Sequence, residues 1–204
     1  MAQMISLDFK HYLERMGRDY EGFNAGLSQI RVYLPGGFWC VAGGAVRRAV
    51  LGEPMTTDYD IFFQSERYYN EAVAKIDASE LGYFKKVKTT KNHTEYVDPD
   101  GLRFQLIKAF FWGDKFESVL DHFDFTICQW LYNPTELEVV TTVEAMTDTL
   151  RKRLAVNKVT YPVSTMRRLI KYTSQGYYAC SGCLNDLIEA TAKVDTEDTF
   201  EYVD

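Results

Sequence analysis

The sequence has no run of about 18 apolar residues, which is the length that a helix needs to cross a bilayer, so no membrane segment is expected. Its N-terminal stretch interleaves charged and apolar side chains and lacks the apolar core of a signal peptide, which favours a cytoplasmic location. Proline is scarce (5 of 204 residues) and 46% of the chain is hydrophobic, which excludes extensive disorder. The length fits one domain, or one domain with a small appendage.

The sequence also lacks an excess of cationic residues, since its formal net charge is −6. This acidity argues against a protein that coats nucleic acid through its overall charge. The charges are nevertheless unevenly placed. Residues 151–185 contain seven cations and no carboxylate, whereas residues 186–204 contain seven acids and one lysine. A local site for a polyanion is therefore compatible with the acidic total.

Cysteine and histidine are too few and too scattered to indicate a metal centre. Cys180 and Cys183 have the spacing of half a zinc site or of a redox pair, but two further ligands with suitable spacing are missing. We interpret this pair as structural. Cys40 and Cys128 stand singly in apolar runs and are expected in the core.

The apolar spacing predicts an α+β fold with helices before, within and after a mixed or antiparallel sheet of about five strands. Helices are expected over 6–34 (broken near Gly22), 45–51, 66–76, 142–153, 163–175 and 182–193. Strands are expected over 38–42, 57–63, 83–90, 94–97, 102–109, 123–132 and 137–140. The lysines that alternate along 85–91 are interpreted as protection of an edge strand.

Two aspartates on one strand indicate a cation site. Asp58 and Asp60 are separated by one residue, so on a strand their side chains point the same way. Two ionised carboxylates this close repel each other unless a positive charge lies between them. Oxygen ligands of this kind suit Mg²⁺ bound together with substrate phosphates, with Mn²⁺ as the alternative.

A diglycine precedes these acids in the chain. Gly43 and Gly44 lie between an expected buried strand and an expected helix, where a missing Cβ lets a ligand approach the backbone. The helix N-terminus can bind phosphate oxygens, and Arg47 and Arg48 are expected to add positive charge there. The order strand, diglycine, helix and Asp-x-Asp strand is more specific than any of its parts.

This order resembles the polymerase β-like nucleotidyltransferase superfamily, and most of all the head domain of bacterial poly(A) polymerases and CCA-adding enzymes. The similarity extends over roughly residues 38–175. Its motifs are Gly43-Gly44-Ala45-Val46-Arg47, Leu51-Gly52, Asp58-Tyr59-Asp60, Asp124-Phe125-Thr126-Ile127 and the basic stretch Arg167–Tyr172. The Arg-Arg that precedes Asp-Phe-Thr-Ile in that family is replaced by His122-Phe123, and the Glu-Asp-x-x-Arg element of CCA-adding enzymes has no match.

The resemblance implies a head domain over 1–141 and a helical segment over 142–194, and an acidic tail is expected over 195–204. It also implies a third acid beside Asp58 and Asp60, for which Asp124 on the strand 123–132 is the candidate. Asp124 could instead simply begin that strand. Glu95 is a weaker candidate, and Gln105 stands where other members of the superfamily place an acid.

The function implied is Mg²⁺-dependent transfer of a nucleoside monophosphate from a nucleoside triphosphate to a hydroxyl. The 3′ end of tRNA or of another small RNA is the expected acceptor. Arg168 and Lys171 are expected to contact nucleotide or RNA phosphates, although a solvated helix face is an equal interpretation. The alternatives are a toxin or defence enzyme that modifies a protein or small molecule, and a catalytically silent module that binds nucleotide or RNA.

Overall fold

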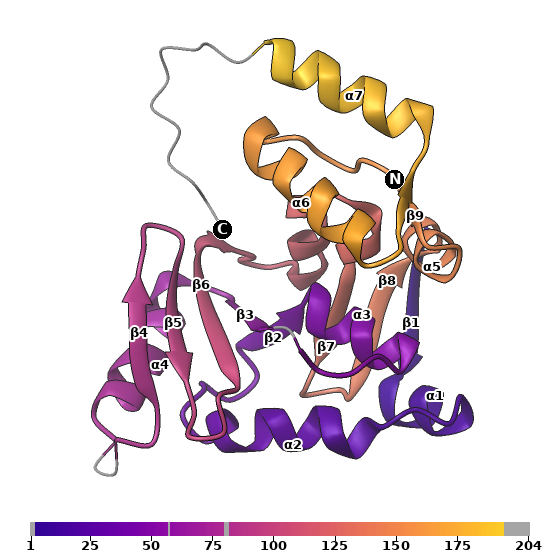
Figure 1. Ribbon diagram of the computed structural model, residues 1–204. Helices are drawn as coiled ribbons and strands as arrows, with labels where there is room; N and C mark the ends of the chain where they lie inside the picture. The colour runs from indigo at the N-terminus through magenta and orange to yellow at the C-terminus, as the bar shows by residue number, and fades with distance from the viewer. Residues whose placement is uncertain (1–2, 57, 80–81, 194–204) are drawn as a thin grey trace.

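The computed structural model describes residues 3–56, 58–79 and 82–193 (Figure 1). Its centre is a mixed sheet of eight strands in the order β1-β8-β7-β2-β3-β6-β5-β4. The strands are β1 (Met4–Asp8), β2 (Trp39–Ala42), β3 (Tyr59–Phe63), β4 (Lys85–Thr89), β5 (His93–Val97), β6 (Arg103–Phe111), β7 (Trp130–Asn133) and β8 (Glu138–Thr142). Neighbouring strands are antiparallel except β3 and β6, which are parallel.

Helices connect and cover these strands. They are α1 (Phe9–Arg15), α2 (Tyr20–Arg31), α3 (Gly44–Leu51), α4 (Glu66–Asp77), α5 (Val143–Leu150), α6 (Pro162–Ser174) and α7 (Ser181–Ala192). Two 3₁₀ helices, η1 (Phe116–His122) and η2 (Thr126–Cys128), lie between β6 and β7. A short parallel pair, β9 (Arg153–Leu154) and β10 (Tyr178–Ala179), forms a separate small sheet. No described helix is long and apolar enough to cross a membrane.

The two faces of the large sheet differ in character. One face packs against α2 and α4 in the main core, where Tyr59, Ile61 and Phe63 of β3 are buried. The opposite face carries a smaller apolar cluster beneath η1, which includes Cys40 and Phe62. In the view of Figure 1, α2 runs below the strands and α6 and α7 lie above them. Asp60 is two residues before Phe62 on β3, so it lies on this second face, away from the main core.

A further core holds the C-terminal helices. It joins Phe125 and Ile127, from the η2 region, to Leu169 and Tyr172 of α6 and to Leu187 of α7. Residues of α6 and α7 therefore pack against the segment between η1 and β7. The acidic tail expected over 195–204 lies outside the described residues.

The structure confirms the predicted α+β class with a helix-flanked mixed sheet but enlarges the sheet to eight strands. Strand β1 was predicted as part of a helix, and it pairs with the edge of β8. The break between the first two helices lies at residues 16–19, and Gly22 is inside α2, where its N–H donates to the Asp19 carboxylate. The strand predicted over 123–132 is β7 only from Trp130 onward, because residues 126–128 form η2.

Candidate functional site

The Gly-Gly turn lies where β2 ends and α3 begins. Gly43 has φ of 84° and ψ of −134°, a conformation that residues with a Cβ rarely adopt. A Cβ at Gly43 would lie 3.2 Å from the ring of Phe123 and 3.4 Å from Oδ2 of Asp60. The Gly43 N–H donates to the carbonyl of Trp130 at 2.8 Å, which fixes the turn to β7. The absence of a side chain therefore lets the backbone lie directly beside Asp60.

The two aspartates of the Asp-x-Asp motif are at the start of β3. Asp58 directly precedes the strand and Asp60 is its second residue, whereas Tyr59 between them is buried in the main core. The Tyr59 hydroxyl donates to the carbonyl of Phe23 in α2 at 3.1 Å, which holds this part of β3 in place. Because side chains alternate along a strand, Asp58 and Asp60 both point to the opposite face.

Gln105 completes the immediate surroundings of the pair. Residues 60 and 105 are directly opposite in the parallel β3–β6 pairing. The Gln105 side-chain Nε2 donates to Oδ2 of Asp58 at 2.6 Å. The position at which related proteins were expected to place an acid is thus occupied by an amide that orients Asp58.

The electrostatics favour a cation at this position. Burial and the neighbouring charge of Asp58 raise the pKa of Asp60 to about 7, while the positive charges of Lys171 and Arg168 act in the opposite direction. A bound cation would offset the repulsion between the two carboxylates. Their oxygen atoms are the ligands that Mg²⁺ prefers, usually together with water and substrate phosphates. The donor set therefore fits Mg²⁺, or Mn²⁺ as the alternative, with Asp58 and Asp60 as ligands.

The Asp124 carboxylate is bonded to side chains of α6. Residue 124 lies before η2 and not on a strand, and its Oδ2 accepts hydrogen bonds from Thr165 at 2.9 Å and from Arg168. No group of three or more His, Cys, Asp or Glu side chains is placed to hold a metal ion in the described part of the chain. The Asp124 carboxylate is thus bonded to α6, and its role as a third metal ligand stays a prediction.

Arg47 and Arg48 contact other parts of the protein, and their predicted contact with phosphate stays a prediction. The Arg47 side chain is 2% exposed, and its guanidinium carbon lies 5.0 Å from the centre of the Tyr172 ring and 5.3 Å from that of Tyr177. Arg48 donates to the carbonyl of Pro54 at 3.1 Å and lies 3.7 Å from the Glu53 carboxylate. Arg47 thus fastens α3 to the C-terminal core, and Arg48 fastens the loop that follows α3.

The two predicted cations of α6 are differently placed. Arg168 is part of an ion pair with Asp124, and Lys171 is exposed. The charges of both residues nevertheless lower the pKa of Asp60, so α6 directs positive charge toward the aspartate pair. The C-terminal segment therefore contributes to the electrostatics of the site although its side chains belong to another core.

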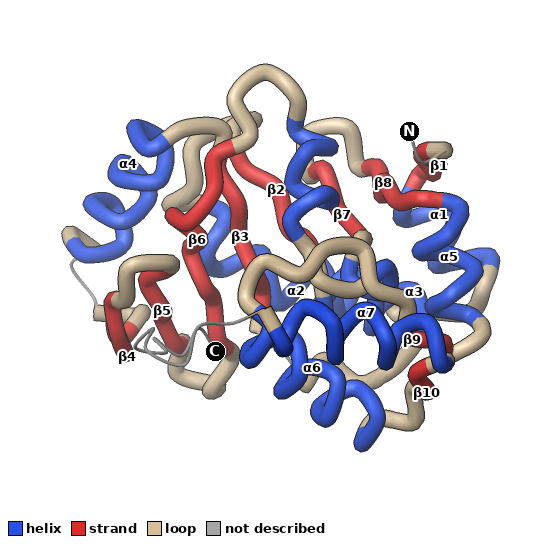
Figure 2. Tube along the Cα trace, turned by 90° about the horizontal axis from the view of Figure 1, so that it is seen from above, coloured by secondary structure: helices blue, strands red, loops and turns tan. Residues whose placement is uncertain are grey.

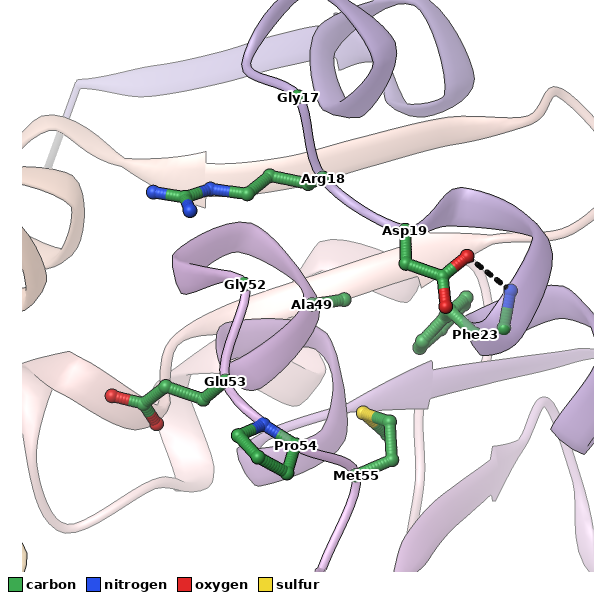
Figure 3. A pocket seen from close by; sticks show the side chains of 10 residues that line it. Gly17, Arg18, Asp19, Phe23, Ala49, Gly52, Glu53, Pro54 and Met55 are labelled. Carbon is green, nitrogen blue, oxygen red and sulfur yellow. Dashed lines mark hydrogen bonds between the residues drawn. The ribbon is translucent and has the colours of Figure 1, made fainter.

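A separate pocket of about 440 Å³ opens between the loop that joins α1 to α2 and the loop after α3 (Figure 3). Arg18 crosses this pocket, and a Cβ at Gly52 would lie 2.6 Å from its side chain. None of the predicted site residues lines it. The candidate site is therefore on the sheet face beside Gly43 and not in this pocket.

Comparisons with known proteins place the chain in a family. The model of the Gabija anti-defense 2 family matches residues 4–152, which is well over half of the chain. The chain belongs to this family. The matched region includes the large sheet, the Gly-Gly turn and the Asp-x-Asp motif, and it ends before α6. No curated protein matches the sequence.

Solved structures share the fold at low sequence identity. A Thermotoga maritima CCA-adding enzyme complexed with tRNA is 20% identical with a TM-score of 0.63, and the match covers 93% of this chain and 46% of that one. A CCA-adding enzyme in complex with CTP is 20% identical with a TM-score of 0.66, covering 93% and 47%. A tRNA-processing enzyme with CTP is 15% identical with a TM-score of 0.53, covering 76% and 43%.

These matches confirm the predicted nucleotidyltransferase fold. This chain spans about half the length of the solved structures that it matches.

Proposed function

We propose that this protein is a metal-dependent nucleotidyltransferase that transfers a nucleoside monophosphate from a nucleoside triphosphate to an acceptor hydroxyl. The observation that carries the proposal is the contact between the Gly-Gly turn and the Asp-x-Asp pair, where Asp60 Oδ2 lies 3.4 Å from the Cβ position of Gly43. A phosphate-binding turn and a cation-binding pair thereby meet at one point. The shared fold of nucleotidyltransferases supports the same conclusion.

The chain's own groups would bind and orient the triphosphate. The backbone N–H groups of the first turn of α3 have no acceptor within the helix, so they can donate to phosphate oxygens. Asp58 and Asp60 would hold Mg²⁺ or Mn²⁺, and a bound divalent ion would neutralise phosphate charge and lower the pKa of the acceptor hydroxyl. Lys171 and Arg168 add positive charge from the side of α6. Gln105 keeps Asp58 in one orientation.

The proposed reaction is a substitution at the α-phosphorus. The acceptor oxygen forms a new bond to this phosphorus, the bond to the α–β bridging oxygen breaks, and pyrophosphate leaves with that oxygen. The hydroxyl proton passes to water. We assign the binding chemistry to residues 1–141 and the flanking positive charge to residues 142–194, and the reaction would take place in the cytoplasm.

The favoured acceptor is the 3′ end of an RNA. The cation-rich segment 151–185 supports a polyanionic acceptor, and one solved structure of the same fold is a complex with tRNA. A protein or a small molecule is the second acceptor class, and the family's description as anti-defense is compatible with it.

A labelling experiment separates these acceptors. The protein is incubated with Mg²⁺, one α-³²P-labelled nucleoside triphosphate at a time, and total tRNA, beside a D58A/D60A variant. The variant D100N, in an exposed turn, is the matched control. We expect label in RNA with the wild type and with D100N only. Label on protein would favour the second acceptor class, and no label together with no Mg²⁺-dependent nucleotide binding would contradict the proposal.

A further inference from the structure

Strand β4 at the edge of the sheet contains an irregularity that changes the direction of a lysine. In its antiparallel pairing with β5, Lys86 is opposite Tyr96 and Lys88 is opposite Glu95, so Val87 has no partner. Without this bulge, Lys86 and Lys88 would point to the same side of the sheet. Because of it they point to opposite sides. Bulges of this kind occur where a side chain must be redirected.

The contacts of the two lysines agree with this description. Lys86 forms an ion pair with Asp77 of α4 and lies 5.6 Å from the centre of the Tyr96 ring, on the face that α4 covers. Lys88 Nζ lies 3.4 Å from Oε2 of Glu95 on the other face. Edge protection alone would need only an exposed lysine and would not require this change of direction.

Glu95 holds a second cation beside Lys88. Its side chain is 4% exposed and also forms an ion pair with Arg103 of β6. Lys88 and Arg103 are 47% and 50% exposed, so both present charge to solvent. One buried carboxylate therefore fixes two exposed cations and leaves an excess of positive charge at this place.

These cations lie on the same face as the aspartate pair. Gln105 is opposite Glu95 in the β5–β6 pairing and opposite Asp60 in the β3–β6 pairing. Directly opposite residues share one face of a sheet, so Asp60, Gln105, Glu95 and Lys88 form a row across four strands. At about 4.8 Å between neighbouring strands, Lys88 is about 15 Å from Asp60. In Figure 2, α6 and α7 do not cover β4 and β5.

A buried histidine on the same face, two residues before Glu95, has one ring nitrogen without a hydrogen-bond partner. His93 of β5 is 4% exposed, and its Nε2 has no hydrogen-bond partner. Burial and the charge of Lys88 lower its pKa, with a smaller contribution from Lys108, so both lysines are near the imidazole. This face of the sheet therefore carries two cations and an imidazole nitrogen without a hydrogen-bond partner, each of which can interact with a phosphate oxygen.

We propose that Lys88 and Arg103, anchored on Glu95, bind the phosphodiester backbone of the acceptor strand a few nucleotides away from its reacting end. The inference rests on the proposed function, since it names the surface that guides an acceptor to Asp58 and Asp60. A nucleic-acid strand fits this row better than a nucleotide does. Its charge extends over the distance from the aspartates to the sheet edge, while the triphosphate is assigned to the Gly-Gly turn.

The bulge supplies a matched pair of variants, K88Q and K86Q, on either side of Val87 in one strand. Binding of a labelled single-stranded RNA to the full chain is measured by fluorescence anisotropy with Mg²⁺ at several salt concentrations. We expect K88Q to weaken binding about three- to tenfold and to reduce the slope of log K against log salt by about 1. K86Q should bind like the wild type, and melting temperatures confirm that both variants are folded. Equal affinities of K88Q and K86Q would overturn the inference.

Two further arms identify the ligand. If K88Q lowers the affinity for Mg²⁺ and nucleoside triphosphate but not for RNA, or weakens binding of polyglutamate as much as that of RNA, the inference is wrong. Its failure is distinguishable from failure of the proposed function. Label transfer with equal RNA affinities of K88Q and K86Q would refute the surface alone, and Lys88-dependent RNA binding without any label transfer would refute the enzyme alone.

Discussion

Asp60 combines burial with a neighbouring negative charge, and both disfavour its ionised form. Its pKa is raised to about 7, whereas an unfolded chain has an aspartate pKa of about 3.9. Between about pH 4 and pH 7 the native state therefore holds a proton that the unfolded state has lost. The free energy of unfolding must fall as the pH rises through this range, and the loss remains above it.

This linkage predicts that D60N is more stable than the wild type at pH 8 in EDTA. We expect a gain of about 1–3 kcal/mol at pH 8 and almost none at pH 4, because the substituted amide carries no charge at either pH. Urea unfolding at both pH values measures the difference, with D100N as control. If the free energy of unfolding of D60N and of the wild type changed in the same way with pH, the pKa of Asp60 would not be raised in the native state.

Gly43 is required by its conformation and by its neighbours. The substitution G43A would place a Cβ 3.2 Å from Phe123 in a left-handed conformation, so we expect a loss of about 2–3 kcal/mol of stability and of nucleotide binding. Gly101 has a similar φ of 86° and open space around it, which makes G101A the control for backbone strain alone. Thermal unfolding should show a smaller loss for G101A, and equal losses would mean that the close packing at Gly43 has no effect.

At the scale of elements, Asp124 fastens the segment before η2 to α6. Its carboxylate is 8% exposed and is bonded by Arg168 and Thr165. We expect D124N to lower the free energy of unfolding by about 1–3 kcal/mol, because Arg168 would lose its charged partner. Mn²⁺ affinity, measured by electron paramagnetic resonance, should stay within twofold of that of the wild type. A loss of Mn²⁺ affinity in D124N as large as that in D58N would show that Asp124 is a ligand.

The two cysteines of the C-x-x-C motif lie at the N-terminal end of α7 and differ in exposure. Cys180 is exposed at its N-cap, whereas Cys183 is 2% exposed in the C-terminal core, and burial raises the pKa of the Cys183 thiol to about 11. Burial also raises the pKa values of Cys40 and Cys128. We expect the native protein to react with one equivalent of Ellman's reagent at pH 8, and C180S with none. Rapid reaction of two or more thiols would show that α7 opens readily.

The same elements show what a single sequence can establish. The Gly-Gly turn and the Asp-x-Asp strand were predictable because turn and strand are local patterns, and the structure brings them together as expected. Strand β1 was missed because Leu7 was assigned to the helical spacing of the residues that follow it, whereas pairing with β8 makes Met4–Asp8 a strand. The roles of Arg47 and Asp124 depend on α6, which is distant in sequence. The bulge at Val87 depends on the partner strand and leaves no local signal.

For the whole molecule, the distribution of charge matters more than its total of −6. Asp58 and Asp60 form a local pair of acids, and cations flank this pair from α6 on one side and from β4 and β6 on the other. The family match ends at residue 152, so it includes the sheet and its row of polar residues but not the core around α6. The sheet face with the Gly-Gly turn and the aspartate pair therefore lies within the part of the chain that the family model matches, whereas α6 lies outside it.

The most direct test of the account is calorimetric unfolding with a non-hydrolysable nucleoside triphosphate, with and without Mg²⁺. A ligand at 100 times its dissociation constant stabilises a protein by about 2.7 kcal/mol, which is about 5–10 °C for a chain of this size. We predict this rise for the wild type only when nucleotide and Mg²⁺ are both present, and none for D58N/D60N. An equal rise in EDTA, or in D58N/D60N, would contradict a metal-dependent nucleotide site at the aspartate pair.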